Sequence, residues 1–195
     1  AKCAVLDTDP QGSIATLYNQ FKDSGDSSWS ELEIIDNKWF EQTKKYDALR
    51  QIDAYDYILI DTPPYLSDRT TPIFKAVDLV IIPTRVSTLD VAAIVSTVNM
   101  VKEAQKQVPR LKAGIVLNAV KTSTKFVQNI RNMIGSYYDL QLLDTAISDR
   151  VDYARTLLAS PYMEPETNET AAKEMAAFGK EILELLKTKK IDHNE

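Results

Sequence analysis

Two aspartates spaced two residues apart close the first apolar run of the chain. Residues 3–6 lead into Asp7, Thr8 and Asp9, and a Pro-Gln-Gly-Ser turn follows directly. In an extended segment, residues two apart share a face, so both carboxylates are predicted to lie together at the carboxyl end of a strand. Their mutual repulsion favours a cation or a polarised water beside them. The same residues also fit a plain strand end, with a turn and Ser13 capping a helix.

A third aspartate closes a second apolar run. Residues 57–60 are apolar without interruption, a pattern typical of a parallel strand buried on both faces, and Asp61 follows them. Pro63 and Pro64 prevent further ladder pairing. Because the carboxyl ends of parallel strands meet at one rim, the three aspartates are predicted to face a common site.

The chemistry open to that rim is narrow. Carboxylates without His or Cys beside them suit a hard divalent cation such as Mg²⁺, held largely through water and shared with substrate phosphates. A Ser/His/Asp nucleophile is excluded from the rim, because the only histidine is His193 in the polar C-terminal tail. The single Cys3 excludes a Cys-ligated zinc or iron–sulfur site within one chain and favours a reducing cytoplasm. No G-x-G-x-x-G motif argues for a dinucleotide.

The composition fits one ordinary domain with a sizeable core. The chain has 195 residues, 44% hydrophobic and 26% charged, and we expect a single domain over residues 1–195. Its net charge of −5 speaks against a uniformly basic nucleic-acid binder but leaves room for a local basic patch. Since no apolar run reaches 18 residues, we expect a protein outside the membrane.

Predicted strands and helices alternate along the whole chain. This alternation is typical of an α/β fold with a doubly wound, mainly parallel sheet. Its clearer strands end in polar residues, which would gather at the ligand-binding rim. The expected strands are 2–7, 33–36, 57–61, 79–83, 112–118 and one within 140–147; the expected helices are 13–22, 38–52, 71–77, 89–106, 125–134, 151–158 and 167–187.

Three segments resemble motifs of the ParA/MinD family of deviant-Walker ATPases, most of all its small plasmid-type partition proteins. Residues 7–13 are similar to the A′ or switch I motif, and residues 57–64 to the Walker B strand with switch II. Residues 79–84 and the strand end at Asn118 follow in the family's order. The resemblance implies a P-loop NTPase fold that uses ATP and Mg²⁺ as cofactors.

The resemblance also implies roles for individual residues. Asp9 would orient or polarise the water that attacks the γ-phosphate, while Asp7 and Asp61 would hold Mg²⁺ through its waters. Asn118 would recognise adenine, although a strand-end Asn that satisfies a turn is an open alternative. The nucleotide-binding positions implied in this way are Pro10, Gln11, Asn118 and Ile147, with the loop to Arg150 flanking the base.

One family feature is missing from the sequence. The family carries a Gly-rich P-loop about one strand–helix unit, about 30 residues, ahead of the A′ motif. None of the five glycines here stands in a Gly-Lys-Ser or Gly-Lys-Thr motif. We therefore expect a chain without the first β-α unit and its Walker A loop, in which ATP binding is weak or lost. ATPase activity is assigned to the parent protein.

Family partners follow from the same resemblance. ParA-type proteins dimerise on ATP binding, bind DNA non-specifically and respond to a centromere-binding ParB-type partner, and they are cytoplasmic and nucleoid-associated. Lys121 and Arg150 are the candidate DNA contacts, against the alternative of ordinary solvated charges. The C-terminal tail has little apolar area, so MinD-like membrane positioning is the less favoured relative.

Two other functions fit the pattern less well. A receiver-type phospho-acceptor domain would use Asp61 as its phosphorylation site, with the paired acids, Thr84 and Lys121 around it, but the chain is long for that fold. A non-catalytic ParA-like binding module is the second alternative, because the P-loop motif is missing.

Overall fold

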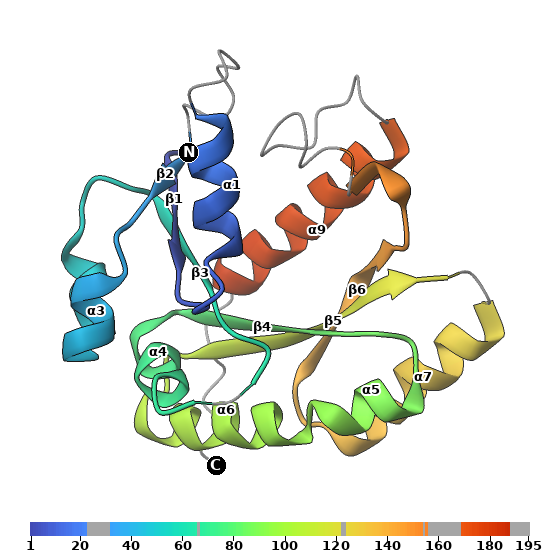
Figure 1. Ribbon diagram of the computed structural model, residues 1–195. Helices are drawn as coiled ribbons and strands as arrows, with labels where there is room; N and C mark the ends of the chain where they lie inside the picture. Colours follow the sequence, from blue (N-terminus) through green and yellow to red (C-terminus); the bar gives the residue numbers. More distant parts are fainter. Residues whose placement is uncertain (23–31, 66, 122–123, 154, 156–168, 188–195) are drawn as a thin grey trace. The chain divides into compact units, whose positions relative to one another are not determined.

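The computed structural model describes residues 1–22, 32–65, 67–121, 124–153, 155 and 169–187 (Figure 1). The chain divides into two compact units, residues 1–76 with 154–162 and residues 77–153 with 163–195, and each is described by itself. The predicted loop 23–30 and half of the predicted helix 151–158, namely residues 154 and 156–158, lie outside the described residues. The single domain predicted from composition stays a prediction.

The first unit holds a three-stranded parallel sheet in the order β2-β1-β3. The central strand β1 buries Ala4 and Leu6 completely. The elements of this unit are β1 (Cys3–Asp7), α1 (Ser13–Phe21), β2 (Glu33–Ile34), α3 (Lys38–Thr43), the 3₁₀ helix η1 (Tyr46–Gln51), β3 (Tyr57–Asp61) and α4 (Thr70–Ala76).

Strand β3 is less buried than its apolar run predicts. Tyr57 is 39% exposed and Leu59 is 55% exposed, and both lie on the face that Asp61 also occupies by alternation. The prediction of burial on both faces is wrong for this strand. An unbroken apolar run indicates a strand, but it carries no information on whether a helix covers each face.

The stretch predicted as one helix over residues 38–52 is broken in two. Lys44 has φ 54°, a left-handed conformation that ends α3, and η1 begins at Tyr46. Phe40, Tyr46 and Leu49 of this stretch are buried, and the rings of Phe40 and Tyr46 stack with centroids 5.9 Å apart. The apolar spacing therefore located the core contacts but not the break.

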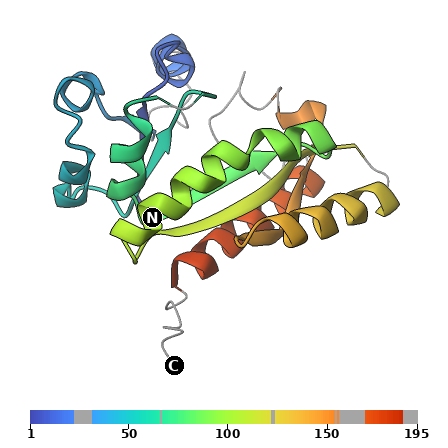
Figure 2. The ribbon, with the colours of Figure 1, turned by 90° about the horizontal axis from the view of Figure 1, so that it is seen from below.

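The second unit holds another three-stranded parallel sheet, ordered β4-β5-β6. The central strand β5 is buried from Ala113 to Leu117. Helices α6 and α7 cover one face of this sheet and α9 covers the other (Figures 1 and 2). The elements are β4 (Leu79–Thr84), α5 (Thr88–Ala93), α6 (Val95–Gln107), β5 (Lys112–Val120), α7 (Thr124–Tyr137), β6 (Gln141–Ser148) and α9 (Glu169–Lys187).

The helix predicted over residues 89–106 is likewise two helices, which meet at Ile94. Ser87 caps α5, because its hydroxyl accepts hydrogen bonds from the amides of Leu89 and Asp90 at 3.2 and 3.4 Å. Ile94, Val98 and Val101, which follow helical spacing, are buried. These contacts hold α6 against the sheet beside β4.

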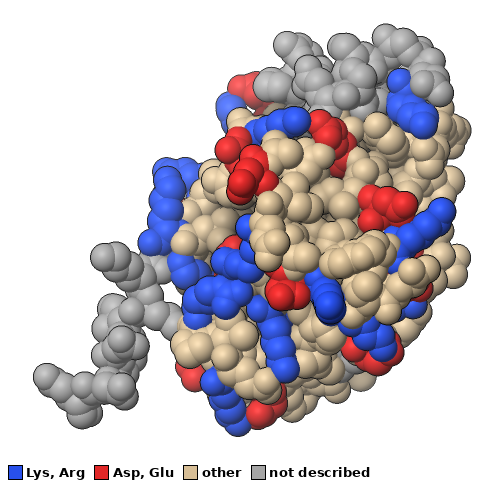
Figure 3. Space-filling view, turned by 90° about the vertical axis from the view of Figure 1, so that its left-hand side faces the viewer, with Lys and Arg blue, Asp and Glu red and all other residues tan. Residues whose placement is uncertain are grey.

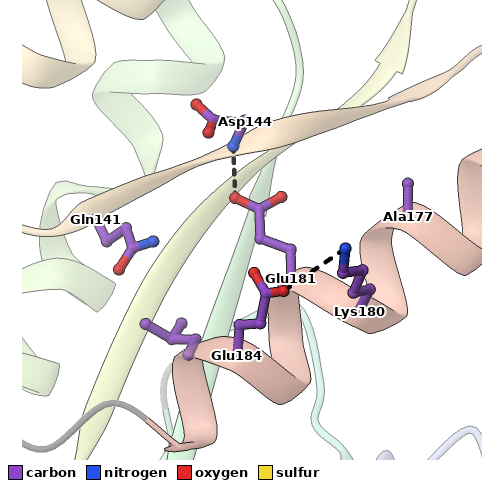
Figure 4. Close-up of a pocket in the computed structure, with 7 residues that line it drawn as sticks. Gln141, Asp144, Ala177, Lys180, Glu181 and Glu184 are labelled. Atoms are coloured by element: carbon purple, nitrogen blue, oxygen red, sulfur yellow. Dashed lines mark hydrogen bonds and ion pairs between the residues drawn. The ribbon is translucent and has the colours of Figure 1, made fainter.

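Strand β6 pairs irregularly with β5. Ile115 pairs with Leu142 and Leu117 pairs with Ala146, so β6 contains extra residues opposite this part of β5 and forms a bulge there. Two charged side chains bind main-chain groups of this bulge. Arg131 of α7 donates to the carbonyls of Leu143 and Asp144 at 2.9 and 2.7 Å. Glu181 of α9 accepts from the amide of Asp144 at 2.6 Å (Figure 4) and from the amide of Thr145 at 2.9 Å.

All strand pairs of the two sheets are parallel and helices flank them, which confirms the predicted α/β class. Among the described residues, no helix is both long enough and apolar enough to cross a bilayer.

Candidate nucleotide site

Asp7 and Asp61 end two neighbouring parallel strands. They are register partners in the β1–β3 pair, so their side chains leave the sheet at the same edge. Thr8 ties the strand ends together, because its amide and its hydroxyl both donate to the carbonyl of Asp61, at 2.9 and 2.6 Å. The predicted meeting of these two aspartates at one rim is thus present in the first unit.

The carboxylate of Asp7 is held by the main chain that follows it. The residue is only 7% exposed. Its Oδ1 accepts from the amide of Asp9 at 3.1 Å, and its Oδ2 accepts from the amides of Ile14 and Ala15 at 3.1 and 3.2 Å. Asp7 therefore satisfies amides of the first turn of α1, where the helix dipole favours a negative charge.

This arrangement corrects the predicted helix cap. Ser13 is the first residue of α1, and Gly12 precedes it with φ 59° and no side-chain capping bond. Glycine suits that left-handed position because it has no Cβ to clash. The capping carboxylate comes instead from the end of β1, which a local sequence pattern does not reveal.

Asp9 lies in the turn rather than on the strand. Its carbonyl accepts from the amide of Gly12 at 2.9 Å and its Oδ1 accepts from the amide of Gln11 at 2.9 Å. The prediction that Asp7 and Asp9 share a strand face is therefore wrong, because strand pairing stops at Asp7. Pro10 and Gln11 are exposed at the tip of this turn.

The three aspartates nevertheless interact electrostatically. The pKa of the Asp61 carboxyl is raised above its usual range, first by partial desolvation and then by the negative charges of Asp7 and Asp9. The amide of Thr62 opposes this shift. Asp61 as a residue is exposed, so the carboxyl is still open to water on one side. Among the described residues, no Lys or Arg contributes to the shift in the pKa of Asp61, so the negative charges of the rim are not offset there.

This charge balance fits a divalent cation held through water. In the described residues, no group of three or more His, Cys, Asp and Glu is arranged to ligate a metal directly. Two oxygens of Asp7 already accept three amides, which leaves it little capacity for direct ligation. Asp61 is the more open carboxylate, so it and Asp7 suit a hydrated Mg²⁺ better than a dehydrated one.

In the second unit, the ends of β5 and β6 lie side by side. Val120 pairs with Ser148, and the amide of Asp149 donates to the carbonyl of Val120 at 3.1 Å. Ala119 has φ 51°, an uncommon conformation for a residue other than glycine and one often stored at functional sites. Asn118 is exposed, and its side-chain oxygen accepts from the Ala119 amide at 2.9 Å.

The remaining predicted site residues of this unit have structural partners. Ile147 is buried with Val116 and Leu143, so only its main chain is available to a ligand. Lys121 is exposed and lies 3.2 Å from Asp149, while Arg150 lies 3.7 Å from Glu174. The DNA-binding role of Lys121 and Arg150 stays a prediction.

The sequence analysis assigned no role to Thr8, Ala119 or Glu174, each of which makes a local contact or adopts a special conformation in the structure. Thr8 stands between two singled-out aspartates and could have been questioned for that reason. Ala119 and Glu174 gave no signal, because an alanine at positive φ and a partly buried glutamate on an amphipathic helix look ordinary in sequence.

Known proteins match most of the chain. A family model described as AAA domain (AAA_31) matches residues 30–113. The maintenance of carboxysome distribution protein A of Halothiobacillus neapolitanus is 24% identical over 80% of this chain and 70% of its own length. The chromosome partitioning protein ParA of Myxococcus xanthus is 25% identical over 81% of this chain and 57% of its own length.

Solved structures share the fold. Apo McdA of Cyanothece superposes with a TM-score of 0.69 at 15% identity, covering 93% of this chain and 88% of that one. An ATP complex of a Cyanothece McdA variant gives 0.67 at 16% identity, covering 98% and 87%. The MinD cell division protein of Aquifex aeolicus gives 0.65 at 14% identity, covering 94% and 84%.

The chain is similar to proteins of the ParA/MinD family. The matched proteins are named for chromosome partitioning, carboxysome distribution and cell division, which supports the resemblance found in residues 7–13 and 57–64. These matches lend no support to the receiver-domain alternative. The matched region spans little more than half of the ParA relative, 57%, so the activity and partners of a whole protein are matters of proposal.

Proposed function

We propose that this chain is a member of the ParA/MinD family and carries the switch and metal-binding half of an Mg-ATP-dependent partition or positioning ATPase. The observation that supports this most is the rim of the first unit. There a buried Asp7 fixes the start of α1, and Asp9 shapes the adjoining turn. Asp61 carries a carboxyl whose pKa is raised by partial desolvation and by its acidic neighbours.

Each aspartate has a distinct task in the proposal. Asp7 and Asp61 hold a hydrated Mg²⁺, which would neutralise charge on the phosphates of ATP. Asp9 orients the attacking water through its carboxylate, with its main chain fixed by the Gly12 contact. Pro10 and Gln11, exposed beyond it, contact the nucleotide.

In the second unit, the paired ends of β5 and β6 contact the adenine base. Asn118 recognises the ring edge, and the main chain from Ile147 to Arg150 flanks the ring. The left-handed Ala119 supports this role, because residues in such sparsely populated conformations cluster at ligand sites.

The Asp9 role is tested by phosphate release in the longest natural polypeptide that contains these residues. Asp9→Ala should lower ATP turnover by about a hundredfold or more while nucleotide binding persists, since general-base and water-positioning groups contribute on that order. Asp36→Ala, an exposed aspartate of the same unit, is the matched control. Turnover unchanged by Asp9→Ala would refute the assignment.

Two kinds of cargo are proposed for the ATPase, DNA and a protein assembly. The ParA relative favours DNA, with an ATP-bound homodimer, a ParB-type partner and nucleoid association, whereas the carboxysome distribution protein among the relatives favours a protein assembly. On the face shown in Figure 3, basic and acidic side chains are interspersed rather than gathered by sign. Electrophoretic mobility shifts with random duplex DNA at rising salt, with and without Mg-ATP, separate the two: steeply salt-dependent binding supports DNA.

A further inference from the structure

The carboxylate of Glu174 contacts four groups at the end of β6 and in the segment after it. Glu174 of α9 accepts through Oε1 from the amide of Ser148 at 2.9 Å and from the hydroxyl of Tyr153. Its Oε2 accepts from the hydroxyl of Ser148 at 2.6 Å and lies 3.7 Å from Nη2 of Arg150. All of these partners stand within residues 148–153, so a single side chain binds the segment at three positions.

The Glu174 carboxylate is largely removed from water. Its side chain is 14% exposed. Burial alone would raise its pKa, but the hydrogen bonds from Ser148 and Tyr153 and the charge of Arg150 outweigh burial and leave the pKa below its usual value. Glu174 is therefore ionised at neutral pH, and its hydrogen bonds are of the stronger, charge-assisted kind.

The same segment is also fixed from its other side. Asp149 donates its amide to Val120 at 3.1 Å and its carboxylate pairs with Lys121 at 3.2 Å. The main chain after β6 is thereby held between α9 and the end of β5, next to Asn118 and the left-handed Ala119.

Packing of α9 does not require this carboxylate. Apolar side chains of α9, namely Met175, Phe178 and Ile182, already pack against the core formed by Val116, Leu143 and Ile147. Partial burial of the Glu174 carboxylate costs desolvation free energy, which its hydrogen bonds to Ser148 and Tyr153 offset. The contacts of Glu174 instead fix the main-chain conformation of residues 148–153.

We propose that Glu174 is a positioning residue, which fixes the main chain of residues 148–153 so that this segment discriminates one purine base from another. The inference rests on the proposed function, which assigns the ends of β5 and β6 to the adenine base. It adds a residue on α9, in contact with the flanking segment rather than with the base.

The test compares adenosine with guanosine as probes, so that no phosphate contact contributes. Saturation-transfer difference NMR on the 195-residue chain gives the ratio of the two dissociation constants. Glu174→Ala should lower the preference for adenosine by about tenfold, the loss expected for charge-assisted hydrogen bonds. Glu174→Gln should retain most of the preference, since its amide oxygen still accepts from Ser148.

Two further variants complete the experiment. Tyr153→Phe removes one hydrogen bond onto Glu174 but keeps the ring, and should lower the preference by about threefold, which covers the case in which Glu174→Ala does not fold. Glu184→Ala, an exposed glutamate on the same helix, should leave the ratio unchanged. A wild-type ratio in folded Glu174→Ala and in Tyr153→Phe overturns the positioning role alone. No signal from either nucleoside in the wild-type chain overturns the proposed base site, and the inference with it.

Discussion

At the scale of single residues, Asp7 shows how one carboxylate can be structural and functional together. It is buried at the end of β1, accepts three amides and carries one of the charges that raise the pKa of Asp61. In the sequence, its spacing from Asp9 predicted a site for a cation or a polarised water. The sequence could not indicate the capping role, because the amides that it binds become neighbours only when the chain turns at Gly12.

Replacement of Asp7 should cost stability as well as activity. Asp7→Ala leaves the amides of Ile14 and Ala15 without their acceptor, and we expect a loss of about 2 kcal/mol in the free energy of unfolding. Urea titration followed by circular dichroism measures it. Asp36→Ala removes a single exposed bond to the Lys38 amide and should cost under about 1 kcal/mol. Equal losses in both variants would contradict the capping role.

Replacement of Asp61 should stabilise the chain at neutral pH, whereas replacement of Asp7 should destabilise it. Because the fold raises its pKa, the charged form destabilises the native state at neutral pH, and this penalty disappears as the pH falls through the unfolded value of about 3.9. Asp61→Asn should therefore raise the free energy of unfolding at pH 7 by about a few tenths of a kcal/mol, because water screens the charge of this exposed group, and should leave it unchanged at pH 3. Urea titrations at both pH values check this; a variant less stable than wild type at pH 7 would contradict it.

At the scale of elements, apolar periodicity located the strands and buried stripes but missed the breaks between helices. Lys44 and Ile94 interrupt stretches whose composition reads as continuous helix. Such breaks arise from where the flanking segments dock, and propensity yields to that tertiary context. The exposure of β3 escaped prediction for the same reason, since covering helices are not encoded in the strand itself.

The bulge of β6 supplies the element-scale prediction. Glu181 accepts the amides of Asp144 and Thr145, and these bonds outweigh burial and lower its pKa. Glu181→Gln should cost about 1 kcal/mol at pH 7. Since the folded pKa is depressed, this contribution is fully present above the unfolded value of about 4.3 and is lost as the pH falls through the folded value.

Thermal unfolding at pH 7 and at pH 3 measures that difference. The wild-type and Glu181→Gln chains should differ at pH 7 and converge at pH 3. Glu184→Gln is the matched control, because Glu184 lines the same pocket as Glu181 (Figure 4) and forms an exposed ion pair with Lys180. It should differ from wild type by under about 0.5 kcal/mol at both pH values.

At the scale of the whole molecule, the α/β class could be predicted from the alternation of strands and helices, and the likeness to the ParA/MinD family from three motifs in order. The division into two compact units could not, because no linker composition marks residues 76 and 77. The order of motifs is a property of the chain, whereas compactness depends on which distant segments contact one another.

The nucleotide response of the chain follows from its motifs. The sequence contains no Gly-Lys-Ser or Gly-Lys-Thr, so the 195 residues supply acidic switch groups without a lysine loop for phosphate. We expect a dissociation constant for Mg-ATP of about 1 mM or weaker, for which 1 mM ligand adds only about 0.4 kcal/mol of stability. Isothermal titration calorimetry and thermal shift measure both quantities. Micromolar binding would show that other groups of this chain hold the phosphates.

The paired contacts of Arg131 and Glu181 with the β6 bulge have a consequence for sequence variation. Each side chain forms hydrogen bonds with main-chain groups of the extra residues that β6 holds opposite Ile115–Leu117. If the extra residues were deleted, Arg131 and Glu181 would lose these partners. If either charged side chain were replaced, main-chain groups of the bulge would lose a hydrogen bond. We therefore expect relatives to keep or discard the arginine, the glutamate and the insertion as one inherited unit.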